Sequence, residues 1–340
     1  MTSKKKTTQP PSEAAFTGKQ IKLFQSFLCN SESARDKLSN TIELWDGVPK
    51  YSISRQDMNK LRDSKGFLPT IERDFHYGGC AFTVKLRPAR ITDEEGNDKE
   101  FYPSAREEIV EDALRKIAAE QGHGFLAGQE SGVMFTLHLL RKELKRRGHA
   151  LSYQEIIESL DVMTGCRIEI AAADGSGDYK SPILTDLMRV SRKKYLEDPQ
   201  ARWLVHFSPL VARSIHMLTY RQYDYHTMMS HTTQLARWLH KRLAHNYVNA
   251  SITQSYTILF STIRRDSALL EYNRLRDAVR KLDNALVELQ EHHILLTFQK
   301  EERTGERSKI LDVSYALTPH PQFVSQIKAA NKRQNDALRQ

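Results

Sequence analysis

The stretch "STIRRDSALLEYNRLRDAVRKLDNALVELQ", residues 261–290, distributes its apolar and basic residues in two different ways. Its large apolar residues follow the i, i+4, i+7, i+11, i+14 spacing of one helix face: Leu275, Val279, Leu282, Leu286 and Leu289. Its cations all lie in the first two thirds: Arg264, Arg265, Arg274, Arg276, Arg280 and Lys281. We therefore predict a short helix capped by Ser261, followed by an amphipathic helix over about residues 272–291 whose N-terminal part is strongly basic.

The segments on both sides of this stretch complete an order of elements. Before it, "MMSHTTQLARWLHKRLAHNY" predicts a helix with Leu235, Leu239 and Leu243 on one stripe, and "SYTILF" predicts a short strand. After it, "ILLTFQK", the turn "EERTGE" and "RSKILDVSYAL" predict a hairpin. The tip of this hairpin carries four cations: Lys300, Arg303, Arg307 and Lys309. Helices followed by a basic hairpin are typical of a winged helix, which we predict for residues 220–333, with a tail over 334–340.

A similar order precedes it, over residues 104–219. "SAREEIVEDALRKIAAEQ" predicts a helix over about residues 105–121, in which Ser104 and Glu107 can form a capping box. "VMFTLHLLRKELKRRGH" predicts a second helix, ended by Gly148, and "LSYQEIIESLDVM" a third, opened by Ser152 with Glu155. The β-prone runs "CRIEIAAA" and "ARWLVHFS" then complete a helix, helix, helix, hairpin order. We predict an earlier winged helix that repeats the architecture but little of the sequence.

The N-terminal part has a different character. Residues 1–13 form a polar tail that cannot bury enough apolar surface to order itself. Residues 14–103 predict a small α+β extension, with two short helices within 16–45 and a hairpin around Tyr77, Gly78 and Gly79. The predicted fold class is α+β and mainly helical, with tandem winged-helix domains and an N-terminal α+β extension.

Composition narrows the class of partner. The chain of 340 residues has 51 Lys and Arg against 42 Asp and Glu, and this net charge of +9 favours an anionic partner such as nucleic acid. Its three cysteines, Cys29, Cys80 and Cys166, are far apart, so they predict neither a disulfide framework nor a CxxC metal site. No apolar run approaches the roughly 20 residues of a membrane span, and the N-terminus lacks an export signal. We expect a cytoplasmic protein without membrane contact.

The basic helix suggests how DNA is read. In a helix-turn-helix, the N-terminal part of the second helix enters the major groove while the remainder packs on the core. At about 100° per residue, Asn273, Arg276 and Arg280 fall within an arc of roughly 60° away from the leucine stripe, so we predict that they read bases. We assign the surrounding cations to phosphates: Arg264, Arg265, Arg274, Lys281, Lys300, Arg303, Arg307 and Lys309. The alternative is a solvated helix with ordinary surface charge.

The segment "RKELKRRG" in the first unit offers a second basic cluster. Its cations could approach the DNA backbone of a neighbouring half-site, and we include four as candidate phosphate ligands: Arg141, Lys145, Arg146 and Arg147. The same residues can instead stabilise a helix C-terminus by facing its dipole. The cations of "RVSRKKY" are open to both interpretations.

Enzyme motifs are absent or incomplete. "GSGDYKS" lacks the GxxxxGK[ST] pattern of a nucleotide loop and predicts a turn. The histidines include no HExxH, and His292 and His293 lie at a helix end rather than spaced on a strand, so we predict no metal site and no cofactor. His138 and Arg141 have the HxxR spacing of tyrosine recombinases, but no well-spaced His or Trp followed by a nucleophilic Tyr lies downstream. We predict no catalytic residue.

Several long segments resemble plasmid replication initiators of the RepA type. They are "AAFTGKQIKLFQSFL", "ELWDGVP", "FYPSAREEIVEDALRKIA", "FTLHLLRKELKRRGHALSYQEIIESL", "TYRQYDYHTMMSHTTQLARWLHKRL" and "STIRRDSALL". Together they span most of the chain from about Ala14 to Leu270, and the resemblance is to initiators of the IncA/C group. "HTTQLARWLHKRL" also occupies the place of the first helix of the C-terminal winged helix in the wider, TrfA-like family of iteron-binding initiators.

The resemblance implies more than the spacing shows. Such initiators bind direct repeats (iterons) at a plasmid origin, open adjacent AT-rich DNA, and recruit the host initiator and the replicative helicase. The resemblance also implies a monomer–dimer equilibrium, repression of the protein's own gene, control of plasmid copy number, and no catalytic residue. The alternatives are a two-domain winged-helix transcriptional regulator that senses a ligand, and a DNA recombinase. A ligand sensor needs an apolar pocket with convergent polar groups, which residues 14–103 do not clearly offer.

Overall fold

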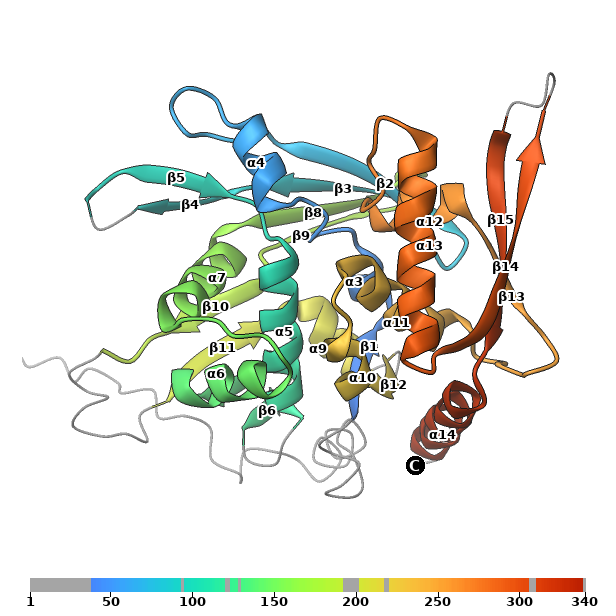
Figure 1. Ribbon diagram of the computed structural model, residues 1–340. Coiled ribbons are helices and arrows are strands. Elements are labelled where there is room, and N and C mark those ends of the chain that lie inside the picture. Colours follow the sequence, from blue (N-terminus) through green and yellow to red (C-terminus); the bar gives the residue numbers. More distant parts are fainter. Residues whose placement is uncertain are drawn as a thin grey trace, which may run out of the picture.

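The fold is described from a computed structural model, which covers residues 38–92, 95–119, 123–127, 130–191, 202–216, 220–305 and 310–338. The described chain is α+β, as predicted, with helices packed beside five antiparallel sheets (Figure 1). The predicted tail 1–13, the first expected helix of the extension and Cys29 lie outside the described residues. No helix within the described part of the chain is long and apolar enough to cross a membrane.

The basic helix and its neighbours form one unit, the C-terminal unit. Its elements are α11 (Gln234–Asn246), β13 (Tyr256–Leu259), α12 (Phe260–Ser267), α13 (Leu275–Glu291), β14 (Leu295–Thr304) and β15 (Ile310–Pro319). The strands pair in the order β13-β15-β14, so the last strand is central. Leu282, Leu286 and Leu289 are fully buried, which confirms the C-terminal part of the predicted apolar face of α13, whereas Val279 is half-buried and Leu275 is exposed.

Two local expectations in the C-terminal unit are wrong. The basic helix begins at Leu275 rather than about 272, because Ala268 ends α12 in a left-handed conformation and Arg274, the residue before α13, still has extended backbone angles. Ser261 does not cap α12, which begins one residue earlier. The backbone N–H and the hydroxyl of Ser261 instead donate to the carboxylate of Asp312 on β15, so this serine connects α12 to the sheet.

The preceding unit, called the middle unit, repeats this order. Its elements are α5 (Ala105–Ala118), β6 (Gly124–Ala127), β7 (Glu130–Phe135), α6 (Leu137–Arg146), α7 (Tyr153–Gly165), β10 (Leu184–Met188) and β11 (Trp203–Phe207). In the sheet order β10-β11-β7-β6, the last strand, β11, lies between β10 and β7, and β7 is the strand that precedes the helices α6 and α7. The last strand of the C-terminal unit, β15, lies in the same way between β14 and β13. Both predicted capping boxes, on α5 and α7, are present.

The strand pairing of the middle unit differs from the prediction. The runs "CRIEIAAA" and "ARWLVHFS" are strands, β8 (Arg167–Ala172) and β11, but they lie in different sheets. The wing-like partner of β11 is β10, whereas β8 pairs with β3 and β9 because Ile168 and Ile170 are buried opposite Leu86 and Val84. The segment "VMF", expected within the second helix, belongs to β7.

The four-stranded sheet β2-β3-β8-β9 crosses the boundary expected at residue 103. It contains β2 (Ile71–Tyr77), β3 (Cys80–Arg87), β8 and β9 (Asp178–Ser181). The predicted hairpin between β2 and β3 is confirmed, and Gly78 and Gly79 both have the positive φ that its tight turn requires. The β8–β9 connection contains the glycines of "GSGDYKS" and is a turn, as expected.

The other described elements surround these two units. They are β1 (Leu38–Ile42), α3 (Glu43–Gly47), α4 (Arg55–Leu61), β4 (Ala89–Thr92), β5 (Asp98–Phe101), α9 (Pro209–His216), β12 (Tyr220–Asp224), α10 (Tyr225–Ser230) and α14 (Pro321–Leu338). β1 pairs with β12, and β4 pairs with β5. α14 continues through most of the range expected as a C-terminal tail.

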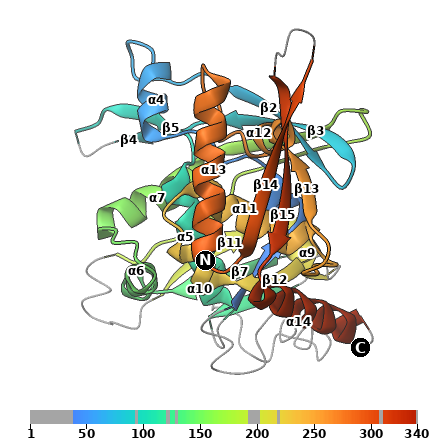
Figure 2. The same cartoon turned by 45° about the vertical axis from the view of Figure 1, so that its right-hand side comes forward.

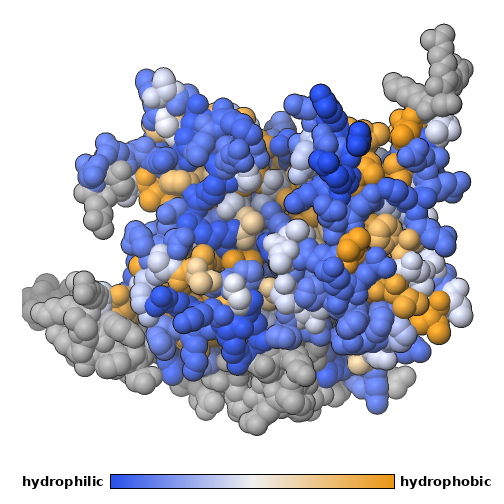
Figure 3. Space-filling view, viewed as in Figure 1, coloured by the Kyte–Doolittle hydropathy of each residue, from blue (hydrophilic) through white to orange (hydrophobic). Residues whose placement is uncertain are grey.

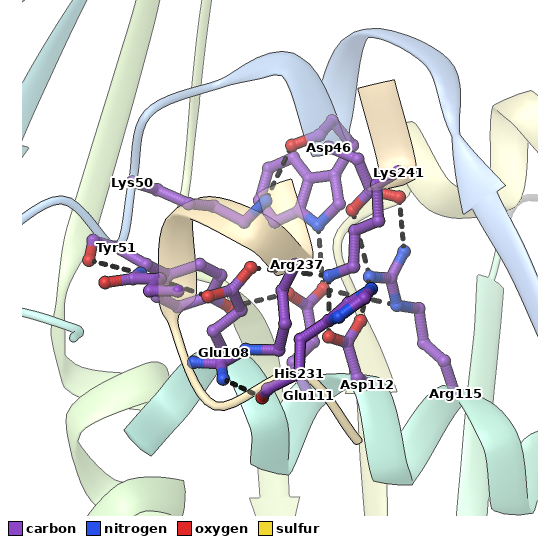
Figure 4. Close-up of polar contacts among 12 residues, drawn as sticks. Asp46, Lys50, Tyr51, Glu108, Glu111, Asp112, Arg115, His231, Arg237 and Lys241 are labelled. Atoms are coloured by element: carbon purple, nitrogen blue, oxygen red, sulfur yellow. Dashed lines mark hydrogen bonds and ion pairs between the residues drawn. The ribbon is translucent and has the colours of Figure 1, made fainter. Parts of the chain in front are cut away.

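A buried network of charges joins the two units. α5 is buried on all sides from Glu107 onward, and its carboxylates point toward α11 and α3 (Figure 4). The ammonium of Lys241 on α11 lies 2.6 Å from Asp112 and 3.4 Å from Glu108. Arg115 lies 2.9 Å from Asp46 on α3. Because buried charges are costly unless they are paired, this network fixes the packing of α5 against α3 and α11.

Candidate DNA interface

The exposed face of α13 changes in character along its length. Arg276, Arg280, Asn284, Val287 and Glu291 are exposed at helical spacing, so the face is cationic at its N-terminal end and apolar and acidic at its C-terminal end. That N-terminal end and the ends of β14 and β15 at Thr304 and Ile310 point to the same end of the molecule (Figures 1 and 2). Figure 3 shows a strongly hydrophilic surface at the N-terminal end of α13 and hydrophobic surface beside it, at the ends of the hairpin strands. Two cations of a helix and the ends of two hairpin strands are thus presented together.

The predicted base-reading residues fall into two groups. Arg276 and Arg280 lie one turn apart on α13, about 40° from one another around the axis. Arg276 pairs with no carboxylate among the described residues, whereas the guanidinium of Arg280, 69% exposed, lies 3.2 Å from Asp277. Asn273 is exposed but lies in the bend before α13, so it does not share the helical arc that we predicted.

Asn284 is a candidate that the sequence analysis missed. It is exposed on α13 one turn after Arg280, on the same face as both arginines. Its carboxamide can bond an adenine edge in two places, as the guanidinium of an arginine can bond guanine. The signal in the sequence is the i+4 spacing from Arg280, which places Asn284 one turn beyond the basic part of the helix.

The predicted phosphate ligands near α12 and α13 are partly engaged within the protein. Arg264 lies 3.2 Å from Glu271, with both side chains about half exposed. Arg265 bonds Asp266 at 2.7 Å and is 37% exposed. Arg274 is exposed just before α13, and Lys281 is half-buried on it. Arg274 and Lys281 are thus the two of these cations that border or lie in the N-terminal half of α13.

The hairpin cations do not all belong to its tip. The ammonium of Lys300 lies 2.6 Å from Asp283 on α13, and Tyr315 of β15 donates its hydroxyl to the same carboxylate. Lys300 therefore helps to hold the hairpin against α13. Arg303 is exposed, pairs with no carboxylate in the described part of the chain, and lies nearer the tip, while Arg307 and Lys309 lie outside the described residues.

The basic cluster of the middle unit lies elsewhere on the molecule. Arg141, Lys145 and Arg146 are exposed on α6, which both ribbon views place at the opposite end from the N-terminus of α13 (Figures 1 and 2). Arg147 is different, because only 2% of its side chain is exposed. It bonds Glu143 at 2.8 Å and a ring nitrogen of His226 at 2.9 Å, so it joins α6 to α10 and is not presented to a phosphate.

The HxxR pair is accompanied by a tyrosine that we did not anticipate. The hydroxyl of Tyr153, at the start of α7, lies 3.5 Å from Nδ1 of His138. The guanidinium of Arg141 lies over the Tyr153 ring at 4.7 Å, and its Nε donates to the carbonyl of Leu151. The arginine is thus stacked on the tyrosine ring, with its Nε already bonded to the backbone.

Comparisons with known proteins identify only distant likenesses. No protein-family model and no curated protein matches the chain. A crystal structure of domains 2 and 3 of RctB, in selenomethionine form, is 10% identical with a TM-score of 0.48, covering 86% of this chain and 99% of that one. A second structure of RctB domains 2–3 is 10% identical with a TM-score of 0.45, covering 78% and 97%. The Pi initiator protein in complex with iteron DNA is 8% identical with a TM-score of 0.37, covering 84% and 99%. At these scores we base no argument on the likenesses.

Proposed function

We propose that the chain is a plasmid replication initiator that binds direct repeats at an origin, opens adjacent AT-rich DNA and recruits host replication proteins. One observation carries the proposal: the cationic end of α13 and the ends of β14 and β15 at Thr304 and Ile310 lie together at one end of the molecule. The C-terminal unit has the helix, strand, helix, helix, hairpin order of a winged helix, and the middle unit has the same order with the strands β6, β8 and β9 in addition. We propose that both are winged helices. The resemblance of the sequence to RepA-type initiators supplies the biological role.

In this proposal the N-terminal end of α13 enters the major groove of double-stranded DNA. Arg276 and Arg280 bond guanine edges, and Asn284 and Asn273 bond adenine edges. The cations around them bind phosphates and fix the position of the helix: Arg264, Arg265, Arg274, Lys281, Arg303, Arg307 and Lys309. The exposed cations of α6 contact the backbone at a second place on the DNA.

The remaining parts of the proposal concern partners and regulation. We propose that the protein works in the cytoplasm, exchanges between monomer and dimer, and represses its own gene when dimeric. We also propose that it has no nuclease, ligase or ATPase activity of its own. Nicking of a supercoiled origin plasmid that is lost on changing His138 or Arg141 would revive the recombinase alternative.

Footprinting on the DNA that flanks the encoding gene tests the proposal. We expect protection of several direct repeats and, on negatively supercoiled plasmid, permanganate reactivity in a neighbouring AT-rich tract that depends on the protein. A transcriptional regulator would instead protect an operator at a promoter without opening DNA. Protection of a promoter alone, with no reactive tract and no protein-dependent plasmid maintenance, would replace the initiator by the regulator.

A further inference from the structure

Three side chains with metal-binding atoms meet behind the C-terminal half of α13. His231 lies in the connection between α10 and α11, and Glu288 and His292 lie one turn apart on α13 and at its C-cap. One ligand atom from each residue lies within 4.8 Å of the other two. The rings of His231 and His292 meet edge to face, with centroids 4.8 Å apart. Two imidazoles and a carboxylate are therefore gathered at one point.

His231 has the clearest sign of a missing ligand. The residue is completely buried, and its Nδ1 has no hydrogen-bond partner among the described residues. Buried polar atoms in proteins are nearly always bonded, so an unpartnered imidazole nitrogen needs a physical explanation. The other nitrogen, Nε2, lies 3.1 Å from Nδ1 of the buried His240. A ligating histidine is commonly oriented in this way by a partner on its second nitrogen.

Glu288 is held in place by a similar set of contacts. It is buried, and its carboxylate accepts the hydroxyls of Thr232 and Thr233 at 2.9 and 2.6 Å. The backbone N–H groups of both threonines also point to it, so the carboxylate is fixed at the start of α11. Hydrogen bonds of this kind orient metal-binding carboxylates in known sites. The guanidinium of Arg237 donates to the backbone carbonyl of His231, so a positive charge also lies close to this residue.

We propose that His231, Glu288 and His292 bind one divalent transition-metal ion, for which Zn²⁺ is the representative. Two nitrogens and one oxygen suit Zn²⁺, Co²⁺ or Ni²⁺, whereas Ca²⁺ and Mg²⁺ prefer oxygen ligands. His292 is half-buried, so an ion has access to solvent for a fourth ligand. This site replaces our expectation of no metal site, which considered His292 only with its neighbour His293 and overlooked Glu288 one turn earlier.

An ion at this site would join two elements of the C-terminal unit. Glu288 and His292 belong to the end of α13, and His231 directly precedes the capping residues of α11. Occupancy therefore ties the C-terminal half of α13 to α11 at the end remote from the exposed arginines. The proposal rests on these side chains and not on DNA binding, so it stands or falls separately from the proposed function.

Cobalt and zinc titrations of the untagged full chain test the site. We expect visible Co²⁺ absorption that saturates at one ion per chain, its loss on adding Zn²⁺, and a rise in melting temperature with Zn²⁺. Replacing the half-buried His292, as His292→Asn, should weaken Zn²⁺ binding at least about tenfold, since it removes one of three protein ligands. Circular dichroism of this variant without metal should match that of the unmodified chain.

The matched control is the adjacent histidine. His293 is exposed and has a positive φ of 58°, a conformation that asparagine accepts, so His293→Asn should retain one Zn²⁺ with unchanged affinity. Glu288→Gln is the second test, because it keeps the shape of the side chain and should also weaken binding. A chain that binds no ion, or equal affinities of His292→Asn and His293→Asn, would overturn the proposal.

Discussion

Replacing Arg276 or Arg280 with alanine separates base recognition from general attraction to DNA. Both side chains are exposed on the N-terminal half of α13, so their removal should change the free energy of unfolding by no more than about 0.5 kcal/mol. A contact between an arginine and a guanine edge is worth about 1 to 3 kcal/mol. Each substitution should therefore weaken binding to the preferred repeat by about 5- to 160-fold and much less to random DNA.

The structure also predicts which of the two arginine substitutions costs more binding free energy. Arg280 lies 3.2 Å from Asp277, and an exposed pair of this kind is worth about 0.2 to 1 kcal/mol, which must be given up when the guanidinium bonds a base. Arg276 has no such partner among the described residues. We therefore expect Arg276→Ala to cost more binding free energy than Arg280→Ala, by up to about 1 kcal/mol.

Fluorescence anisotropy at one fixed salt concentration measures these effects. The probes are a duplex selected by the unmodified protein from a random pool and a scrambled duplex of equal length. Lys328→Ala is the charge-matched control, because Lys328 is exposed on α14, away from the N-terminus of α13 (Figure 1). Leu282→Ala is the folding control, since it truncates a fully buried side chain and should cost about 2 to 5 kcal/mol of stability without altering specificity.

Unchanged binding of both arginine variants to the selected duplex would refute the reasoning. The two arginines would then contact neither bases nor phosphates, and the base-reading residues would have to be sought in the middle unit. The first place to search would be α7, which follows α6 there as α13 follows α12 in the C-terminal unit. Equal losses on selected and scrambled duplexes would show that the two arginines contact phosphates instead.

Three further outcomes follow from the charges of the molecule. Arg303→Ala should weaken binding to the selected and to the scrambled duplex by similar factors, and it should reduce the slope of log K against log salt by about 0.9. An affinity that is constant between about 50 and 200 mM salt would contradict DNA binding through phosphates. Lys241→Met leaves Asp112 buried without its closest cation, so urea unfolding should show a loss of about 3 to 5 kcal/mol; a loss below about 1 kcal/mol would contradict the role of the network. Burial opposes ionisation of Asp46, but Arg115 and two nearby lysines lower the pKa of this carboxyl below its usual value. Its stabilisation is therefore present above the ordinary aspartate pKa of about 3.9 and is lost as pH falls below it. The free energy of unfolding should drop by up to about 1.4 kcal/mol per pH unit there, and Asp46→Asn should show a shallower drop. Equal slopes would show that the carboxyl is not stabilised as an anion.

Features set by neighbouring residues could be predicted from the sequence. The capping boxes of α5 and α7 depend on a serine and a glutamate three positions apart, and the β2–β3 turn depends on two consecutive glycines. The apolar face of α13 also repeats at a fixed local spacing. Each of these signals lies within a few residues of the sequence, so the identity of the side chains was sufficient to predict the local structure.

The pairing of strands and the burial of single cations could not be predicted from the local sequence in this way. The composition of β8 predicts a strand, but its partner β3 is distant in the sequence. The pairing is selected because Ile168 and Ile170 are buried opposite buried residues of β3 in the same sheet. Arg146 and Arg147 are consecutive arginines in one basic run, yet one is exposed and the other is enclosed by Glu143 and α10. Only the packing of α10 onto α6 distinguishes them.

The position of α11 explains why the candidate DNA interface depends on residues far from it. Glu288 of α13 accepts a hydrogen bond from Thr233, the residue that caps α11, while Lys241, farther along the same helix, bonds Asp112 of α5 in the middle unit. One helix therefore holds the proposed reading helix on one side and the buried charge network on the other. Neither contact follows from the local pattern of α11, whose leucine stripe predicts only that one face is buried. The sequence could thus indicate which helix presents cations, whereas the direction in which it presents them is set by two long-range contacts, the hydrogen bonds of Glu288 and the ion pair of Lys241.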